Sequence, residues 1–174
     1  MTEVSSADVA AGIEDVIAGN ETKVSLEEAN QLFNAHMQKQ QEKAHAGNIE
    51  KGKTFLIENA KKEGVTSLPS GLQYEVMTEG NGPSPGPTDQ VTTHYHGTLL
   101  NGTVFDSSVE RGQPASFPVN GVIMGWQEAL QLMKVGSKWR LFVPHTLAYG
   151  ERGAGGAIGP YETLIFEVEL LSID

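Results

Sequence analysis

Apolar residues recur at helical spacing in the first third of the chain. One stripe has the i, i+4, i+7, i+8 spacing of an amphipathic helix and consists of Val9, Ile13, Val16 and Ile17. Gly19-Asn20 is a typical helix end. Ser25, followed three residues later by Glu28, forms a capping box, so a second helix is predicted to begin there. The pattern therefore predicts a helical hairpin.

The second predicted helix changes character along its length. It is apolar on one side near both ends, through Leu26, Ala29, Phe33 and Met37 at the start and Phe55, Leu56 and Ala60 at the end. Residues 38–53 are almost wholly polar, which predicts a solvent-exposed connector. If unbroken, the helix has roughly forty residues and is about 60 Å long. Gly47 and Gly52 each weaken a helix by about 1 kcal/mol, so the pattern allows a bend or break there.

The hairpin is too small to bury its own apolar stripes well. One interpretation is a dimerisation element, and another is a hairpin that folds back on the rest of the chain. The polar connector favours the first, because it would hold the hairpin away. A third hypothesis is a chaperone role, in which the exposed stripes of residues 1–63 capture unfolded protein chains.

From Gly64 onward, β-branched and aromatic residues alternate with polar ones. Strands are predicted over residues 72–76, 91–100, 138–143 and 163–173. Asn101-Gly102 is a strong hairpin turn signal, because both residues tolerate positive φ. Only residues 125–133 have convincing helical spacing. We therefore predict an α+β fold, an antiparallel β-sheet wrapped around one short α-helix.

The change in pattern also predicts the division of the chain. The expected parts are an N-terminal helical region over residues 1–63, a linker over 64–71 and a second domain over 72–174. The length of 174 residues is sufficient for one well-packed core.

Composition narrows the classes of function. A net charge of −10 disfavours binding to nucleic acid or to an anionic membrane surface. The absence of cysteine excludes disulfides and thiolate metal sites. No apolar run reaches transmembrane length, and the first residues lack the pattern of a signal peptide. We therefore expect a cytoplasmic location, or a periplasmic one if a leader has been removed.

Familiar catalytic motifs are missing. There is no cysteine nucleophile and no G-x-S-x-G elbow. The glycine-rich stretch over residues 149–163 ends in Gly159-Pro160 before a strand, unlike a phosphate-binding loop. His94 and His96 would share one strand face and could begin a metal site, but no carboxylate at suitable spacing accompanies them. A pair of surface histidines is the favoured interpretation.

An aromatic set remains that could be either a core or a site. It consists of Tyr95, Phe105, Phe117, Trp126, Tyr149 and Phe166, with the aliphatic Val122, Ile123 and Ile158 and the acidic Asp106. Aromatic residues usually dominate cores. Taken alone, the residues therefore favour a core, but three details weaken that interpretation: Trp126 and the tyrosines carry polar groups that need partners when buried, Asp106 would be costly to bury unpaired, and Tyr149 begins the glycine-rich stretch.

Three segments carry a resemblance to a known family. VTTHYHGTLLNGTVFDSS, GVIMGWQEALQLM and LAYGERGAGGAIGPYETLIFEVELL strongly resemble FKBP-type peptidyl-prolyl cis-trans isomerases, over about residues 68–174. The helical N-terminus resembles the bacterial macrophage-infectivity-potentiator-like branch, whose members are V-shaped homodimers. The resemblance implies proline-containing peptides and unfolded protein clients as substrates, macrolide immunosuppressants as inhibitors, a homodimer formed through the N-terminal helices, and no cofactor or metal.

The resemblance also implies roles for individual residues. The catalytic set would be Tyr95, Phe105, Asp106, Trp126, Tyr149 and Phe166. The substrate-binding set would be Arg111, Phe117, Val122, Ile123 and Ile158. Trp126 would form the pocket floor. Tyr149 would donate its hydroxyl and Ile158 its backbone N–H to a peptide, while Asp106 would accept hydrogen bonds and Arg111 would pair with Asp106 or Tyr95.

Two functions remain open on these residues. The first is an isomerase that acts on unfolded or nascent chains. The second is a binding module, in which the same pocket recognises proline-containing peptides and bond rotation is incidental. Acceleration of X-Pro rotation in a protease-coupled assay would distinguish them.

Overall fold

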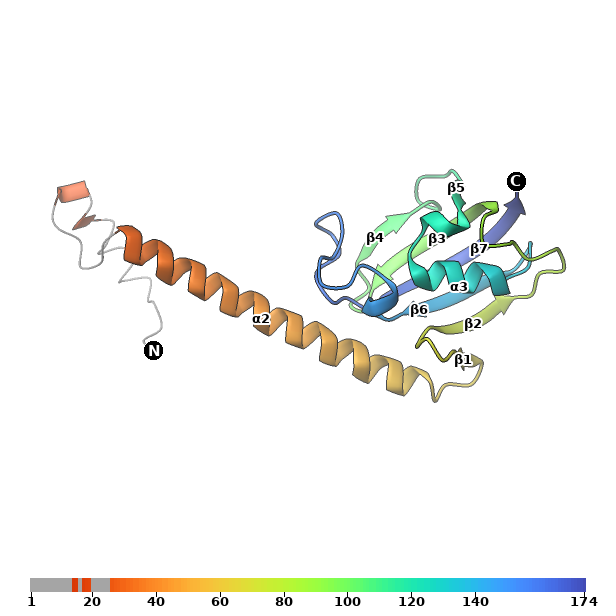
Figure 1. The fold of residues 1–174 in the computed structure, drawn as a ribbon, viewed down its shortest axis with the longest axis horizontal. Helices are drawn as coiled ribbons and strands as arrows, with labels where there is room; N and C mark the ends of the chain where they lie inside the picture. Colours follow the sequence, from red (N-terminus) through yellow and green to blue (C-terminus); the bar gives the residue numbers. More distant parts are fainter. Residues whose placement is uncertain (1–13, 16, 20–25) are drawn as a thin grey trace. The chain divides into compact units, whose positions relative to one another are not determined.

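The computed structural model describes residues 14, 15, 17–19 and 26–174 (Figure 1). The chain divides into two compact units, residues 1–43 and 44–174. Residues 14, 15, 17 and 18 are helical, as predicted, whereas the rest of the first apolar stripe and the capping box at Ser25 lie outside the described residues.

Helix α2, Leu26–Asn59, is continuous through both of its glycines. The allowed break at Gly47 or Gly52 therefore does not occur. The predicted exposure of residues 38–53 is seen only in part: residues 38, 39, 42, 46, 49–51 and 53 are exposed, whereas His45, Gly47 and Asn48 are half-buried and Gly52 is buried. The apolar Phe33 and Met37 before this stretch are exposed as well, at 62% and 43%.

The last turns of α2 pack against the sheet within the second unit. The rings of Phe55 and Phe142 lie 5.8 Å apart. The buried Asn59 donates from Nδ2 to Oε1 of Gln73 at 3.0 Å, and Nε2 of Gln73 donates to the carbonyl of Leu56 at 2.9 Å. These contacts fix the end of α2 to the second strand of the sheet.

Gly52 explains how α2 approaches the sheet so closely. A Cβ at this position would lie 2.3 Å from Oγ1 of the buried Thr163. At Gly47 a Cβ would meet nothing within 4 Å. The sequence pattern treats the two glycines alike, but only Gly52 is required by packing.

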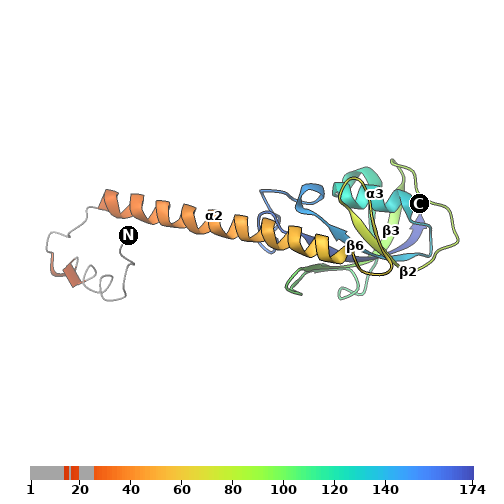
Figure 2. The same ribbon diagram turned by 90° about the horizontal axis from the view of Figure 1, so that it is seen from below.

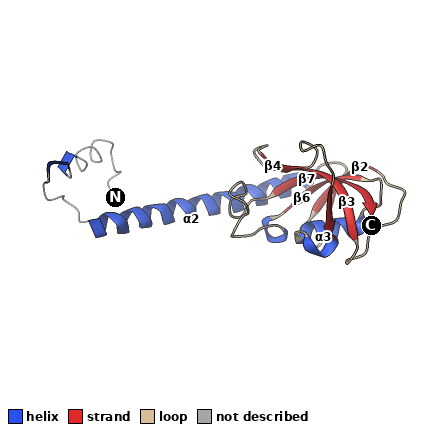
Figure 3. Cartoon of the chain, turned by 90° about the horizontal axis from the view of Figure 1, so that it is seen from above, coloured by secondary structure: helices blue, strands red, loops and turns tan. Residues whose placement is uncertain are grey.

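The seven strands form one antiparallel sheet with the order β1-β2-β6-β7-β3-β4, and β5 also pairs with β3. Their bounds are β1 Val65–Ser67, β2 Gln73–Thr78, β3 Gln90–Leu99, β4 Val104–Ser107, β5 Ala115–Pro118, β6 Lys138–Val143 and β7 Leu164–Ile173. Helix α3, Met124–Leu132, lies on one face of this sheet (Figures 2 and 3). The predicted α+β fold is confirmed.

The long strands follow the predicted alternation, whereas three short strands were not predicted. Every second residue is buried along β3, and in β7 the same alternation extends from Leu164 to Leu170. Strands β4 and β5 have only four residues each. Strand β1, with three residues, lies in the expected linker over 64–71 and pairs with β2.

The hairpin between β3 and β4 differs in detail from the prediction. Gly102 has φ of +85°, but Asn101 does not take a positive φ. Instead, Oδ1 of Asn101 accepts a hydrogen bond from the N–H of Thr103 at 3.0 Å. Asparagine therefore stabilises the turn through its side chain rather than through its backbone.

Helix α3 and the inner sheet face form the core. Trp126, Ala129 and Leu130 of α3 are buried against the sheet. A Cβ on Gly125 would lie 2.6 Å from Cγ1 of Val143, so glycine lets the first turn of α3 contact β6. On the outer face, Arg140 bridges Glu75 and Glu167 at 3.1 and 2.8 Å.

No helix in the described parts of the chain combines the length and the apolar character that crossing a bilayer requires.

We predict opposite effects for the two glycines of α2. Gly52→Ala should lower the free energy of unfolding by about 1–3 kcal/mol, because the new methyl group overpacks against Thr163. Gly47→Ala, the matched control, should raise it by about 0.5–1 kcal/mol, because alanine favours the helix. Urea unfolding would measure both. Equal shifts in the two variants would contradict the packing of α2 on Thr163, the residue before β7.

Candidate active site

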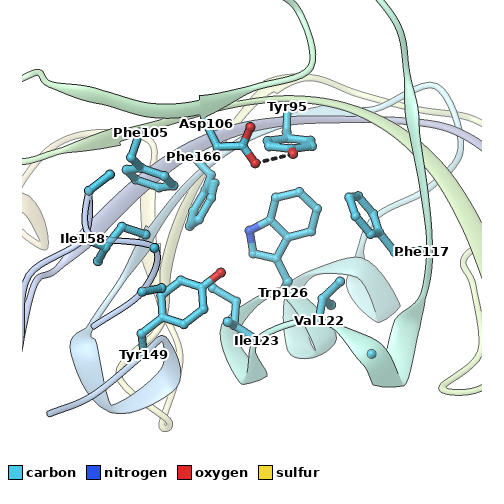
Figure 4. A pocket seen from close by; sticks show the side chains of 14 residues that line it. Tyr95, Phe105, Asp106, Phe117, Val122, Ile123, Trp126, Tyr149, Ile158 and Phe166 are labelled. Carbon is cyan, nitrogen blue, oxygen red and sulfur yellow. Dashed lines mark hydrogen bonds between the residues drawn. The ribbon is translucent and has the colours of Figure 1, made fainter. Parts of the chain in front are cut away.

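An open cavity of about 550 Å³ lies between the inner sheet face, α3 and the loop after β6 (Figure 4). Its lining consists of Tyr95, Phe105, Asp106, Phe117, Gly121, Val122, Ile123, Trp126, Tyr149, Ala154, Gly155, Ala157, Ile158 and Phe166. The structure thus brings together every predicted site residue except Arg111, which lies beside Asp106 at the edge. The aromatic set surrounds a hollow that opens to solvent.

Trp126, in the first turn of α3, forms the floor of the cavity. Its ring stands nearly perpendicular to those of Tyr95, Phe117 and Phe166, with centroid distances of 5.4, 6.1 and 5.3 Å. Such edge-to-face contacts are the favoured geometry of aromatic pairs. The indole nitrogen has no hydrogen-bond partner among the described residues. Ring packing therefore fixes the orientation of the floor.

Phe105 and Phe166 form one wall, and Gly97 makes this wall possible. The two rings are 5.4 Å apart at an angle of 84°. A Cβ on Gly97 would lie 2.6 Å from Phe105 and 3.0 Å from Phe166. Gly97 was not among the predicted site residues, although a glycine inside a strand is a signal of close approach.

Tyr95, Asp106 and Arg111 form a polar cluster at the cavity edge. The Tyr95 hydroxyl donates to Oδ2 of Asp106 at 2.5 Å, and Nη2 of Arg111 donates to the Tyr95 hydroxyl oxygen at 2.8 Å. Nη1 of Arg111 forms an ion pair with Oδ1 of Asp106. Arg111 thus contacts both of its expected partners, and the carboxylate is not left unpaired beside the aromatic set.

These contacts shift the pKa values of the cluster. Burial alone would raise the pKa of Asp106, but the hydrogen bonds from Tyr95 and Arg111 outweigh it, so this pKa lies below its usual range. Burial and the hydrogen bond to Asp106 raise the pKa of the Tyr95 hydroxyl. At neutral pH the cluster therefore holds an ionised Asp106 and a protonated Tyr95.

Two buried serines after Asp106 hold the polar cluster in place. Oγ of Ser108 accepts from the Tyr95 N–H at 2.7 Å. Nδ1 of His94 lies 3.1 Å from the same oxygen, and Nδ1 of His96 lies 3.0 Å from Oγ of Ser107.

The described residues contain no group of three or more histidine and acidic side chains arranged to hold a metal ion.

Tyr149 stands at the cavity rim. Its side chain is 41% exposed, and its hydroxyl points into the cavity (Figure 4). Burial and the charge of Asp106 raise the pKa of this hydroxyl, which keeps it protonated as a hydrogen-bond donor.

The loop over residues 149–163, which we call the pocket loop, closes one side of the cavity. Ala154 and Ile158 pair with each other: the Ala154 N–H donates to the Ile158 carbonyl at 2.9 Å, and the Ile158 N–H donates to the Ala154 carbonyl at 3.0 Å. The Ile158 N–H is therefore not free for a peptide, contrary to the expected role. Gly153 has φ of +62°, and a Cβ there would lie 2.2 Å from the Ile158 carbonyl oxygen.

A different backbone donor is free at the cavity. Ile123 lines the cavity and immediately precedes α3, with φ of −60° and ψ of 152°. No described residue accepts a hydrogen bond from its N–H, as is usual for the first N–H groups of a helix. The position of Ile123 just before the predicted helix was the signal that the sequence offered for this donor.

Comparisons with known proteins agree with this geometry. The family model described as FKBP-type peptidyl-prolyl cis-trans isomerase matches residues 82–171. The model described as the domain amino terminal to FKBP-type peptidyl-prolyl isomerase matches residues 1–76.

Individual proteins give the same result. The FKBP-type 22 kDa peptidyl-prolyl cis-trans isomerase of Escherichia coli K12 is 54% identical over 170 residues, covering 94% of this chain and 81% of that protein. The outer membrane protein MIP of Legionella longbeachae is 56% identical over 126 residues, covering 72% of this chain and 54% of that protein. The crystal structure of FkpA from Escherichia coli superposes with a TM-score of 0.85 at 39% identity, covering 99% of this chain and 84% of that one.

The motifs, the fold and these similarities point to one family. The isomerase model alone spans more than half of the chain, and a relative of similar length shares more than half of its residues. The chain therefore belongs to the FKBP-type peptidyl-prolyl cis-trans isomerases, the enzymes that accelerate rotation about the peptide bond preceding proline.

Proposed function

We propose that the aromatic cavity is the place where X-Pro bonds of unfolded or nascent protein chains rotate. The observation that carries this proposal is the open hollow above Trp126, whose lining side chains are apolar apart from Asp106, the Tyr95 and Tyr149 hydroxyls and the indole nitrogen of Trp126. A proline ring is apolar and compact, so it suits such a hollow. Its burial is favourable by roughly 25 cal/mol per Å² of apolar surface.

The chemistry requires no nucleophile. Amide resonance gives the X-Pro bond partial double-bond character and a barrier of about 20 kcal/mol. Resonance also separates charge between oxygen and nitrogen, and water stabilises that polar planar form. A cavity lined by Phe105, Trp126 and Phe166 stabilises the polar planar form less than water does, and therefore favours the twisted, less polar state. The site thus binds the transition state more tightly than the ground state.

Two donors are placed to hold the substrate carbonyls while the bond turns. The Tyr149 hydroxyl points into the cavity from the rim, and the Ile123 N–H is free at the start of α3. We assign to Ile123 the backbone contact that the resemblance gave to Ile158, and Ile158 then serves as a wall with Val122 and Phe117. One side of the X-Pro bond would be fixed while the other rotates.

The polar cluster of Tyr95, Asp106 and Arg111 is proposed to fix the position of the Tyr95 ring in the cavity lining. Its three groups satisfy one another, so Tyr95 keeps its ring against Trp126. A macrolide immunosuppressant would compete with substrate for the cavity, because it presents apolar rings and carbonyl acceptors to the same donors.

The alternative function is a binding module for proline-containing peptides. The same donors would serve both functions, and the membership of the chain in the FKBP-type isomerases favours catalysis.

We also propose that the N-terminal helical region forms a homodimer. Ile17, Phe33 and Met37 are apolar yet exposed in the described part of this region. A second copy of the chain would cover them, and unfolded clients could bind the same surface.

The division into a helical region over residues 1–63 and an isomerase domain over 72–174, with β1 at the junction, stays a proposal.

Of the two locations that the sequence left open, we propose the periplasm. One relative, with 56% identity over 126 residues, carries the name outer membrane protein MIP, which favours the cell envelope over the cytoplasm.

The first test of the site compares a wall with a donor. Phe105→Ala should lower kcat/KM in a protease-coupled assay on an X-Pro peptide by well over about tenfold, because it opens the cavity to water. Tyr149→Phe should lower it by only about two- to tenfold, the worth of one hydrogen bond. Circular dichroism would confirm folding. Equal kcat/KM values in wild type and both folded variants would refute the assignment, and a wild type that binds the peptide without accelerating rotation would establish the binding module.

The second test uses pH. The pKa of Asp106 is lower in the folded chain than in the unfolded chain. In the unfolded chain the pKa of an aspartate is about 3.9. Its stabilising contribution is therefore present above that value and is lost as pH falls through the folded pKa. Asp106→Asn should be less stable than wild type at pH 7, by at most about 1 kcal/mol because the side chain is 44% exposed.

The difference should close below about pH 4 in denaturant titrations. Glu110→Gln, which alters an exposed carboxylate with no ion pair among the described residues, is the control and should show no such closure. A difference that persists unchanged at low pH would show that the charge of Asp106 contributes nothing.

The third test concerns assembly. Sedimentation should give about twice the chain mass of 18.7 kDa for the wild type. Phe33→Ser with Met37→Ser should shift the protein toward the monomer. Leu132→Ser, at an exposed apolar position on α3, should leave the assembly unchanged. A wild-type chain that sediments as a monomer at all concentrations would exclude the dimer.

A further inference from the structure

The pocket loop lines the cavity but has little structure of its own. Its described residues form one isolated β-bridge, between Ala154 and Ile158, and Gly150, Gly153, Gly155 and Gly156 all have positive φ. Glycines lower the cost of many backbone conformations, so contacts elsewhere must hold the loop at the cavity.

One backbone hydrogen bond, between Tyr161 and Gly150, joins the two ends of the pocket loop; we call this pair, with Pro160, the neck of the loop. The N–H of Tyr161 donates to the carbonyl of Gly150 at 2.7 Å. Tyr161 has φ of +59° and is the one non-glycine residue with positive φ in the described chain. A bulky residue rarely adopts this backbone conformation and keeps it only where its surroundings hold it.

Two residues of α2 provide that hold. Nδ2 of Asn48 donates to the carbonyl of Pro160 at 2.9 Å, directly before Tyr161. The centroid of the His45 ring lies 5.4 Å from that of the Tyr161 ring, and the centroid of the His145 ring lies 5.3 Å from it. The neck is thus attached to α2 on the side of the loop that carries Tyr161, while Ala154, Ala157 and Ile158 face the cavity.

We infer that Asn48 and His45 of α2 are positioning residues for the isomerase site, acting through the neck of the pocket loop. The hydrogen bond of Asn48 and the ring contact of His45 are made to Pro160 and Tyr161, which do not line the cavity. They fix Pro160 and Tyr161, and through Gly150 they also restrain the adjacent Tyr149 at the rim. The connector helix thereby contributes to catalysis. This inference rests on the proposed function of the cavity.

Asn48→Asp is the sharpest test, because it keeps the size of the side chain and removes the N–H donor. It should lower kcat/KM for an X-Pro peptide by about two- to tenfold, the effect of one lost hydrogen bond. Asn48→Gln retains an amide donor and should recover part of the loss. Thr54→Asp adds the same charge at an exposed position of α2 and should match wild type.

Trypsin provides a readout that a general loss of stability would not reproduce. Arg152 is exposed within the pocket loop, so cleavage after it reports the mobility of the loop. Asn48→Asp should be cut at Arg152 several times faster than wild type, with the rates at other sites unchanged.

The outcomes are distinct. A wild-type protein that fails to accelerate rotation would overturn the proposed function. If the wild type is active and Asn48→Asp has the same kcat/KM, the positioning role alone is overturned. The positioning role is also overturned if Thr54→Asp lowers kcat/KM as much as Asn48→Asp does, or if Asn48→Gln lowers it as much as Asn48→Asp does. Faster cleavage spread evenly over all sites would reduce Asn48 to a residue that stabilises the fold.

Discussion

The edge-to-face packing of rings around Trp126 is the constraint on which the site depends. Tyr95, Phe117 and Phe166 stand nearly perpendicular to the indole and keep it flat at the base of the cavity. Rigid rings held in this way cannot collapse into the hollow as flexible aliphatic side chains would. An apolar region therefore stays open in a chain whose remaining interior is tightly packed.

Two glycines make this packing possible from the sheet and from the helix. Gly97 in β3 leaves space for Phe105 and Phe166, and Gly125 brings α3 against Val143. A methyl group at either place would push the floor away from the wall. The polar groups are kept to the margin, where Asp106, Tyr95 and Arg111 satisfy one another. The cavity is thus lined by aromatic rings at the base and by polar groups at the mouth, an arrangement that suits selective stabilisation of a twisted amide.

The sequence predicted the parts of the fold that repeat a pattern. Strands β3, β6 and β7 are long enough for alternation to be visible, and α3 has clear helical spacing. Strands β1, β4 and β5, with three or four residues each, are too short to show a period, and β1 was assigned to a linker. The continuity of α2 through Gly52 was not predictable either, because the reason is the distant Thr163.

The same limit applied to the site. Side-chain chemistry and the family motifs identified the aromatic lining, and the structure gathers it around one cavity. Backbone roles were harder to assign, because they depend on which N–H groups are already bonded. The Ile158 N–H is bonded to Ala154 and the Ile123 N–H is free, and only coordinates distinguish the two. The contacts of Asn48 and Tyr161 likewise join residues more than a hundred positions apart in sequence.

The most direct test of the account is the exchange between the cis and trans signals of an X-Pro peptide, followed by NMR with catalytic amounts of the chain. Two buried tryptophans form a matched pair: Trp126 lines the cavity, whereas Trp139 stacks on Tyr74 away from it. Uncatalysed exchange takes about 10–100 s. The wild type and Trp139→Leu should both accelerate it strongly, while folded Trp126→Leu should be slower by about tenfold or more. Equal acceleration by the two variants would contradict the claim that the aromatic cavity is the catalyst.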